Sequence, residues 1–203
     1  SDLLLNYNLI IFGSNAGKDG NITSTVSNSS NQSALNTWLS NGGNIFMNVY
    51  NDGGGGINFL NLPGLSFSNQ DNNGTSYTLV NDDPIFNAPH DVVSEILTIK
   101  SWEKLVTFPT AATEKTIHIE NGGYISAASF KWGEGRVFFW GQPIDTNHSS
   151  WPGLQDVYGT DIATDFAENI YTQMSSTIPE PDSIAMFCIT IIALFSKQIL
   201  KGI

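Results

Sequence analysis

The stretch from residue 9 to residue 50 constrains the fold most, because a helical segment lies between two short apolar runs. The runs 9–13 and 45–50 each have the length of a buried strand. The segment between them carries a cap, an apolar helical face and a stop signal: Ser30 or Asn31, then Ala34, Leu35, Trp38 and Leu39, then Asn41-Gly42-Gly43. Strand, helix and strand in this order predict a right-handed crossover and two parallel strands.

The middle of the chain is richer in strand patterns. Runs of β-branched and aromatic residues, separated by Asn, Asp, Gly and Pro, occur at 65–68, 76–80, 96–99, 105–108 and 117–119. Segments 125–131 and 136–140 flank Trp132-Gly133-Glu134-Gly135, which is typical of a hairpin. An apolar stripe predicts a last helix at 161–174. We therefore expect an α/β fold: a mainly parallel sheet flanked by helices, with a β-rich insertion.

Charge and cysteine content exclude several function classes. The 203-residue chain has 8 basic residues and a net charge of −11, so it lacks the cationic surface that nucleic acids require. The one cysteine, Cys188, lies in the apolar segment 184–195. The rest of the chain therefore offers no thiolate, disulfide or thiolate metal site. The sequence predicts no cofactor and no bound metal.

Several motifs together resemble one fold family. They read LLNYNLIIFG, QSALNTWLSNGGNIFMNVY, NDDPIFNAPHDV and KWGEGRVFFWGQP, followed by the closing helix. These motifs resemble the class I glutamine amidotransferase-like fold, and more closely its trehalose-utilisation-type branch. The resemblance implies a flavodoxin-like domain at 1–175. Because members of that family carry one more strand–helix unit before the first strand here, we expect this domain to be truncated at its N-terminus.

The same resemblance bears on catalysis. Catalytic members place a cysteine nucleophile in a sharp turn after the central strand, with a histidine and an acid nearby. The corresponding segment, 49–56, contains neither Cys nor Ser. The sequence therefore favours a protein that is not an enzyme.

Polar residues after the predicted strands are the candidate ligand residues. Open α/β sheets bind ligands beyond the carboxyl ends of their strands. The candidates there are Asn51, Asp52, Gln142, Asp145, His148 and Trp151. Asp145 and His148 could share a proton or coordinate a metal, but no third partner is identifiable. His90 and His118 stand alone in the sequence and are interpreted as structural or solvent-exposed residues rather than as ligands.

The C-terminus carries the most specific motif. Pro179-Glu180-Pro181 is followed by the apolar segment 184–195 and by Lys197 and Lys201. As one helix, the residues from about 182 to 200 would be roughly 28 Å long, close to the ~30 Å hydrocarbon core of a bilayer. We therefore predict a linker at 176–183 and a transmembrane helix with a basic tail at 184–203.

This arrangement resembles the PEP-CTERM sorting signal of Gram-negative bacteria. The resemblance implies exosortase as a partner. It also implies a membrane-anchored precursor that is exported to the cell envelope or the extracellular matrix. The resulting hypothesis is a non-catalytic surface or matrix protein that binds extracellular polysaccharide. The alternative is an envelope glycan hydrolase with a site around Asp145 and His148.

Overall fold

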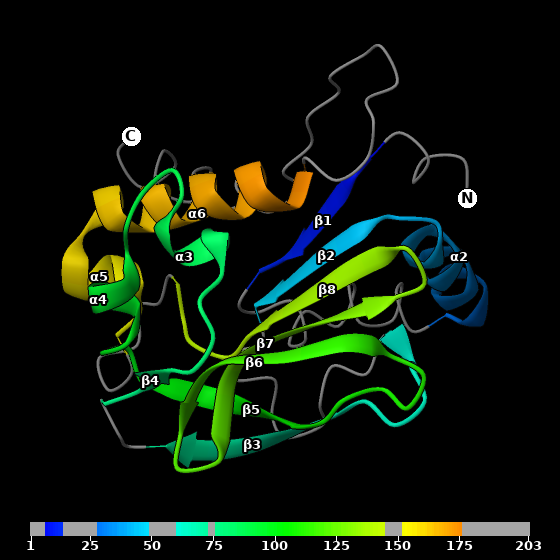
Figure 1. Cartoon of the computed structure of the whole chain (residues 1–203), viewed down its shortest axis with the longest axis horizontal. Coiled ribbons are helices and arrows are strands. Elements are labelled where there is room, and N and C mark those ends of the chain that lie inside the picture. Colours follow the sequence, from blue (N-terminus) through cyan, green and yellow to red (C-terminus); the bar gives the residue numbers. More distant parts are fainter. Residues whose placement is uncertain (1–6, 14–27, 49–59, 73–75, 145–151, 176–203) are drawn as a thin grey trace, which may run out of the picture.

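The computed structural model describes residues 7–13, 28–48, 60–72, 76–144 and 152–175. These residues form five helices and one sheet of eight strands (Figure 1). In chain order the elements are β1 (Leu9–Phe12), α2 (Ser29–Ser40), β2 (Asn44–Asn48), β3 (Ser66–Asn72), β4 (Thr78–Leu79), α3 (Pro84–Asn87), α4 (Val93–Ile96), β5 (Ser101–Thr107), β6 (Thr113–Asn121), β7 (Tyr124–Trp132), β8 (Gly135–Trp140), α5 (Leu154–Tyr158) and α6 (Thr160–Ser175).

The sheet is mixed. Its strands follow the order β1-β2-β8-β7-β5-β3, while β6 pairs with β7 and β4 pairs with β6. Among the described strands, the β1–β2 and β2–β8 pairs are parallel. The other pairs are antiparallel. The predicted strand–helix–strand unit at the start is confirmed, but the prediction of a mainly parallel, flavodoxin-like sheet is wrong.

A tight hairpin explains why the sheet is not mainly parallel. Trp132 pairs with Gly135, so two residues connect β7 to β8, and Gly133 at the tip has a φ of 63°. Such a turn requires positive φ and makes the joined strands antiparallel neighbours. The strands that the sequence suggested as an insertion are therefore continuous with β8, the third strand of the parallel group.

The predicted fold class also included a C-terminal transmembrane helix at 184–203. Those residues lie outside the described ranges. Within the described ranges, none of the helices combines the length and the apolarity needed to cross a bilayer. The fold of the described residues therefore contains no transmembrane helix.

The two faces of the sheet have separate apolar clusters. On β2, Ile45 and Met47 belong to the cluster that includes Leu35 and Leu39 of α2. Phe46, between them, belongs to the cluster that includes Phe166 of α6. This alternation follows from the two-residue period of a strand. The sheet therefore separates α2 from the helices α3 to α6 (Figure 1).

Trp38 fixes α2 to the sheet. It is 6% exposed, and its indole Nε1 donates to the Tyr7 carbonyl at 2.9 Å. The ring lies so close to Gly43 that a Cβ atom there would lie 2.3 Å from ring carbons. Glycine after the helix therefore serves close packing as well as the predicted stop.

Two local predictions are corrected. The cap of α2 is Asn28, whose side chain accepts from the Ser30 amide at 3.0 Å, and not Ser30 or Asn31. The predicted strand 96–99 begins at the end of helix α4, because Val92 and Ile96, one helical turn apart, are both fully buried. An apolar run of four residues does not distinguish these two structures.

Candidate functional site

The carboxyl ends of the three parallel strands lie at one edge of the sheet. Asn48 ends β2, and its side-chain Nδ2 donates to the carbonyls of Trp140 at 3.1 Å and Gln142 at 2.7 Å. Asn48 is 2% exposed. This buried amide therefore holds the chain just beyond β8 against the end of β2, at the edge where open α/β sheets bind their ligands.

Gln142, one of the predicted site residues, is fully buried at this edge. Among the described residues, the buried side-chain atoms without a hydrogen-bond partner include Oε1 and Nε2 of Gln142 and Nε1 of Trp140. Native proteins satisfy most buried polar atoms, since an unmade hydrogen bond in an apolar interior costs about 1–3 kcal/mol. Three such atoms within three residues therefore mark this edge as unusual.

The other predicted site residues lie outside the described ranges. These are Asn51, Asp52, Asp145, His148 and Trp151, together with Pro179, Glu180 and Pro181 of the predicted sorting motif. Their predicted roles stay predictions. Within the part of the chain that the structure describes, no three His, Cys, Asp or Glu side chains are grouped so that they could hold a metal ion.

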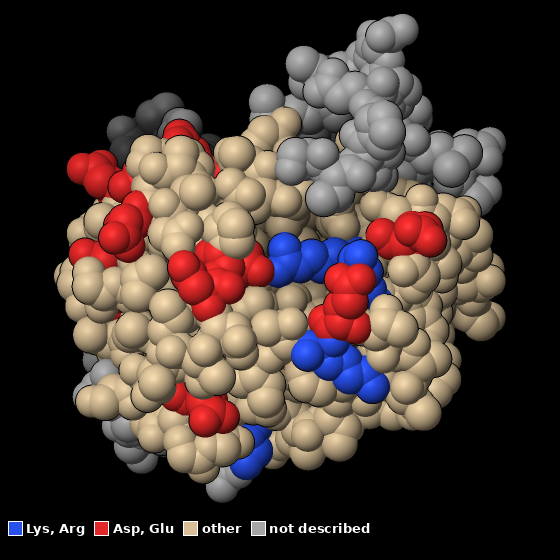
Figure 2. Space-filling model, in the orientation of Figure 1, with Lys and Arg blue, Asp and Glu red and all other residues tan. Residues whose placement is uncertain are grey.

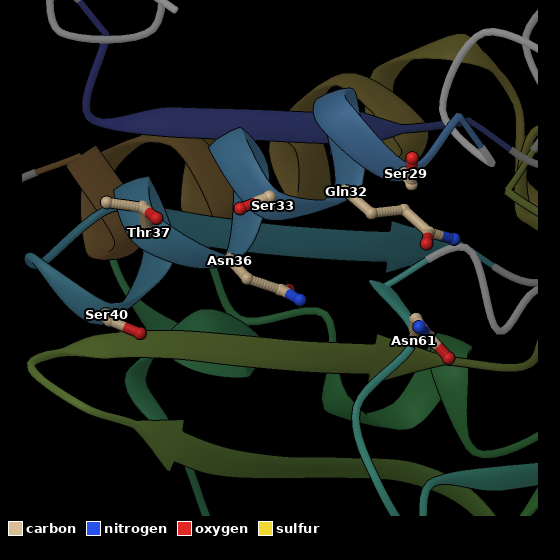
Figure 3. A pocket seen from close by; sticks show the side chains of 7 residues that line it. All are labelled: Ser29, Gln32, Ser33, Asn36, Thr37, Ser40 and Asn61. Carbon is tan, nitrogen blue, oxygen red and sulfur yellow. The ribbon is translucent and has the colours of Figure 1, made fainter.

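A groove runs along α2, on the face of the sheet opposite to α6 (Figure 3). Its volume is about 400 Å³. Six of its lining side chains come from α2, and Gln32 and Asn36 extend toward the segment that carries Asn61. The lining consists of Ser29, Gln32, Ser33, Asn36, Thr37, Ser40 and Asn61. We call this feature the α2 groove.

The α2 groove is lined only by neutral hydrogen-bonding side chains. Hydroxyl and amide groups each donate and accept, and none of the seven ionises near neutral pH. Asn36 Oδ1 is a buried acceptor without a partner in the described structure. The groove suits a neutral ligand rich in hydroxyl groups better than an ion, because an ion would find no opposite charge in the lining.

A buried polar network lies on the α6 face. His118 is 2% exposed, and its Nε2 lies 2.8 Å from the hydroxyl oxygen of Ser129 and 3.7 Å from the carboxylate of Asp83. The guanidinium of Arg136 forms an ion pair with Asp83 and also donates to Ser129 at 3.3 Å. Figure 2 shows basic and acidic side chains in contact over strands β6 to β8.

Burial favours the neutral form of His118. Its Nδ1 lies 3.1 Å from the Asn81 carbonyl, which can only accept, so the proton resides on Nδ1. Burial lowers the pKa of His118 below its ordinary value of 6.5, although the Asn81 hydrogen bond and the Asp83 charge oppose that shift. His118 also stacks on Phe138, with ring centres 5.1 Å apart. These contacts agree with the interpretation of His118 as structural.

His90 joins a loop to α6. Its backbone amide donates to Asn169 Oδ1 at 3.0 Å, and Asn169 Nδ2 donates to the His90 carbonyl at 2.7 Å. The ring Nε2 lies 2.9 Å from the carboxylate of Glu168, and Nδ1 lies 3.6 Å from Asp165. The contacts of His90 are therefore those of a loop attachment.

Comparison with known proteins adds evidence on the fold. No family model matches the chain, and no curated protein matches it. Among solved structures, the cytoplasmic protein STM1381 from Salmonella typhimurium LT2 is 12% identical with a TM-score of 0.55, over 84% of this chain and 73% of that one. The cytoplasmic protein STM3548 from Salmonella typhimurium is 11% identical with a TM-score of 0.50, over 86% and 74%. At this identity the similarity concerns the fold alone.

None of these findings supports the predicted location. Both of these solved structures are of proteins named as cytoplasmic, and no described helix could span a membrane. The prediction of an exported, membrane-anchored precursor that reaches the cell surface is therefore not carried further. Exosortase as a partner depended on the same prediction and is not proposed. The resemblance to the amidotransferase-like family stays untested, because no family model matches.

Sequence analysis missed the α2 groove and the partners of His118. A signal for the groove existed. Residues 29, 32, 33, 36, 37 and 40 repeat at helical spacing and are all neutral and polar, although such a face is usually only solvated. The partners of His118 had no comparable signal, since Asn81 lies 37 residues away in the sequence.

Proposed function

We propose that this protein is a non-catalytic binding domain for a neutral polysaccharide, and that the α2 groove is its binding surface. The observation that carries the proposal is the lining of the groove by seven neutral hydroxyl and amide side chains. The whole chain has 19 acidic and 8 basic residues, yet none of them lines the groove. Hydroxyl-rich sugars exchange hydrogen bonds with such groups without a change in charge.

The contacts within the groove support the same proposal. Asn36 Oδ1 is a buried acceptor without a partner in the described structure. A sugar hydroxyl that donates to it would supply the missing hydrogen bond. The hydrolase alternative requires Asp145 and His148, which lie outside the described residues. No observation on the described residues favours it.

Affinity electrophoresis tests the proposal. Purified protein is run through gels that contain dextran, mannan or xylan, with the anionic polysaccharide alginate as a comparison. We expect at least one neutral polysaccharide to retard the protein and alginate to have no such effect, because the acidic chain repels it.

Variants locate the binding surface. The double variant Ser33→Ala/Asn36→Ala removes two hydrogen-bonding groups, and its affinity should fall about thirtyfold, since each net hydrogen bond contributes roughly 1 kcal/mol. Thr172→Ala, an exposed change on α6, is the matched control and should bind as the wild type does. If no neutral polysaccharide retards the protein, or if alginate retards it equally, the proposed function is wrong.

A further inference from the structure

The edge beyond β8 carries three buried polar atoms that the fold leaves unused. Trp140 is 1% exposed and Gln142 is fully buried. Indole Nε1 offers one donor, amide Nε2 offers two, and Oε1 is an acceptor. In the described structure none of the three has a hydrogen-bond partner. Trp140 ends β8, and Gln142 follows it by two residues, in a bend of the chain.

Other buried polar groups at this edge are satisfied. Asn48 Nδ2 donates to two carbonyls. The Ser101 hydroxyl donates to the Gly141 carbonyl at 2.9 Å, and the Gly141 amide donates to the Ser126 carbonyl at 2.8 Å. These groups of Asn48, Ser101 and Gly141 therefore have partners without the Gln142 amide or the Trp140 indole. These two groups are left available for a molecule that is not part of the chain.

The surroundings of the Trp140 ring are apolar and aromatic. The Trp140 ring centre lies 4.8 Å from that of Phe166 and 6.2 Å from that of Phe86. Leu154 belongs to the same buried cluster, and Ile144 packs against it. A ligand here would therefore find two kinds of donor, one acceptor and apolar walls.

The charge of the site selects against ions. Arg136, on the same strand as Trp140, lies four residues earlier, roughly 13 Å along the strand at about 3.3 Å per residue. It is already paired with Asp83. An anion that left water to reach Gln142 would lose its hydration without gaining a cation. A neutral ligand with both donor and acceptor fits better.

We infer that the Gln142 amide and the Trp140 indole form a site for an acetamido group, as carried by an N-acetylated amino sugar. The carbonyl of that group accepts from the indole Nε1 or the amide Nε2, its N–H donates to Gln142 Oε1, and its methyl group contacts the aromatic cluster. The acetamido site follows from the three atoms alone. The choice of a sugar as its carrier rests on the proposed function.

Nuclear magnetic resonance on the full chain tests this site. The indole N–H signal of Trp140 is assigned by its loss in Trp140→Phe. The protein is then titrated with N-acetylglucosamine, with glucose as the matched sugar that lacks the group, and with acetamide as the group alone. We expect N-acetylglucosamine and acetamide to shift the Trp140 signal and glucose to leave it unchanged.

Two variants test the roles of the side chains. Gln142→Leu keeps most of the side-chain volume but removes both amide atoms. This variant should lower the affinity for N-acetylglucosamine at least tenfold. If that variant fails to fold, Trp140→Phe, read by another shifted signal, tests the second donor in the same way. Thr172→Ala, the exposed change on α6, is the control and should leave this affinity unchanged.

The outcomes separate the two proposals. Equal shifts with glucose, no shift with N-acetylglucosamine and acetamide, or unchanged affinity in both edge variants would overturn the acetamido site. The proposed function would survive that result if neutral polysaccharides still retard the protein. Conversely, an acetamide shift without any retardation by polysaccharide would keep the site and remove the sugar as its carrier.

Discussion

The two faces of the sheet bury different kinds of side chain. The face toward α2 packs mostly aliphatic side chains, such as Leu39, Ile45 and Val137, and its polar groups lie outside, along the α2 groove. The face toward α6 buries Asp83, His118 and Asn169 among aromatic rings. Buried polar groups on the second face depend on specific partners, so single substitutions there should have larger and more pH-dependent effects than on the first.

The largest expected effect comes from breaking the ion pair on the α6 face. Arg136→Met leaves Asp83, whose side chain is 9% exposed, without its cation. Because an unpaired buried charge costs about 3 kcal/mol or more, we expect the free energy of unfolding to fall by about 3 kcal/mol in urea denaturation.

The exposed pair on the neighbouring hairpin is the control. Lys131 and Glu114 lie 2.7 Å apart, but their side chains are 43% and 64% exposed. Lys131→Met should therefore lower the free energy of unfolding by less than about 1 kcal/mol. Equal losses in the two variants would mean that burial does not distinguish the two pairs.

A smaller effect is expected from overpacking the α2 face. Gly43→Ala places a Cβ atom 2.3 Å from ring carbons of Trp38. Overpacking of this kind costs typically 1–3 kcal/mol, so we expect a loss of about 2 kcal/mol, measured by thermal or urea unfolding.

A double-variant cycle identifies the cause of that loss. The three closest ring carbons belong to the indole of Trp38, and Trp38→Phe replaces this two-ring system with a single ring. If the clash is the cause, Trp38→Phe should cost less in the Gly43→Ala background than in the wild type. Additive losses would contradict this explanation.

The third effect is a dependence on pH. Burial lowers the pKa of His118 in the folded protein below 6.5, so below pH 6.5 the unfolded chain binds more protons than the folded one. The contribution of His118 to the free energy of unfolding is therefore fully present above pH 6.5. It decreases as the pH falls toward the folded-state pKa. One group changes stability by at most about 1.4 kcal/mol per pH unit.

Comparison with His118→Gln isolates this contribution from that of the carboxyl groups. The free energy of unfolding of each protein is measured between about pH 5 and pH 8, the range in which histidine titrates. The wild type should lose more stability below pH 6.5 than the variant. Parallel curves for the two proteins would show that His118 does not titrate on unfolding as its burial implies.

Local patterns in the sequence identified the elements whose signals are themselves local. The unit from β1 through α2 to β2, the β7–β8 hairpin and the helix α6 were each predicted from periodicity and turn residues. The one predicted site residue within the described ranges, Gln142, does lie at the carboxyl edge of the parallel strands. That placement could be predicted because it depends only on strand order and direction along the chain.

Tertiary structure alone decided the direction of most strand pairs and the partners of the buried polar groups. A strand pattern shows which side chains are buried, but the same pattern fits a parallel or an antiparallel neighbour. Likewise, Asn48 and Gln142 are 94 residues apart, and Asp83 and Arg136 are 53 apart. Contacts over such distances leave no periodic signal, because they depend on how the whole sheet is assembled rather than on the residues nearby in the chain.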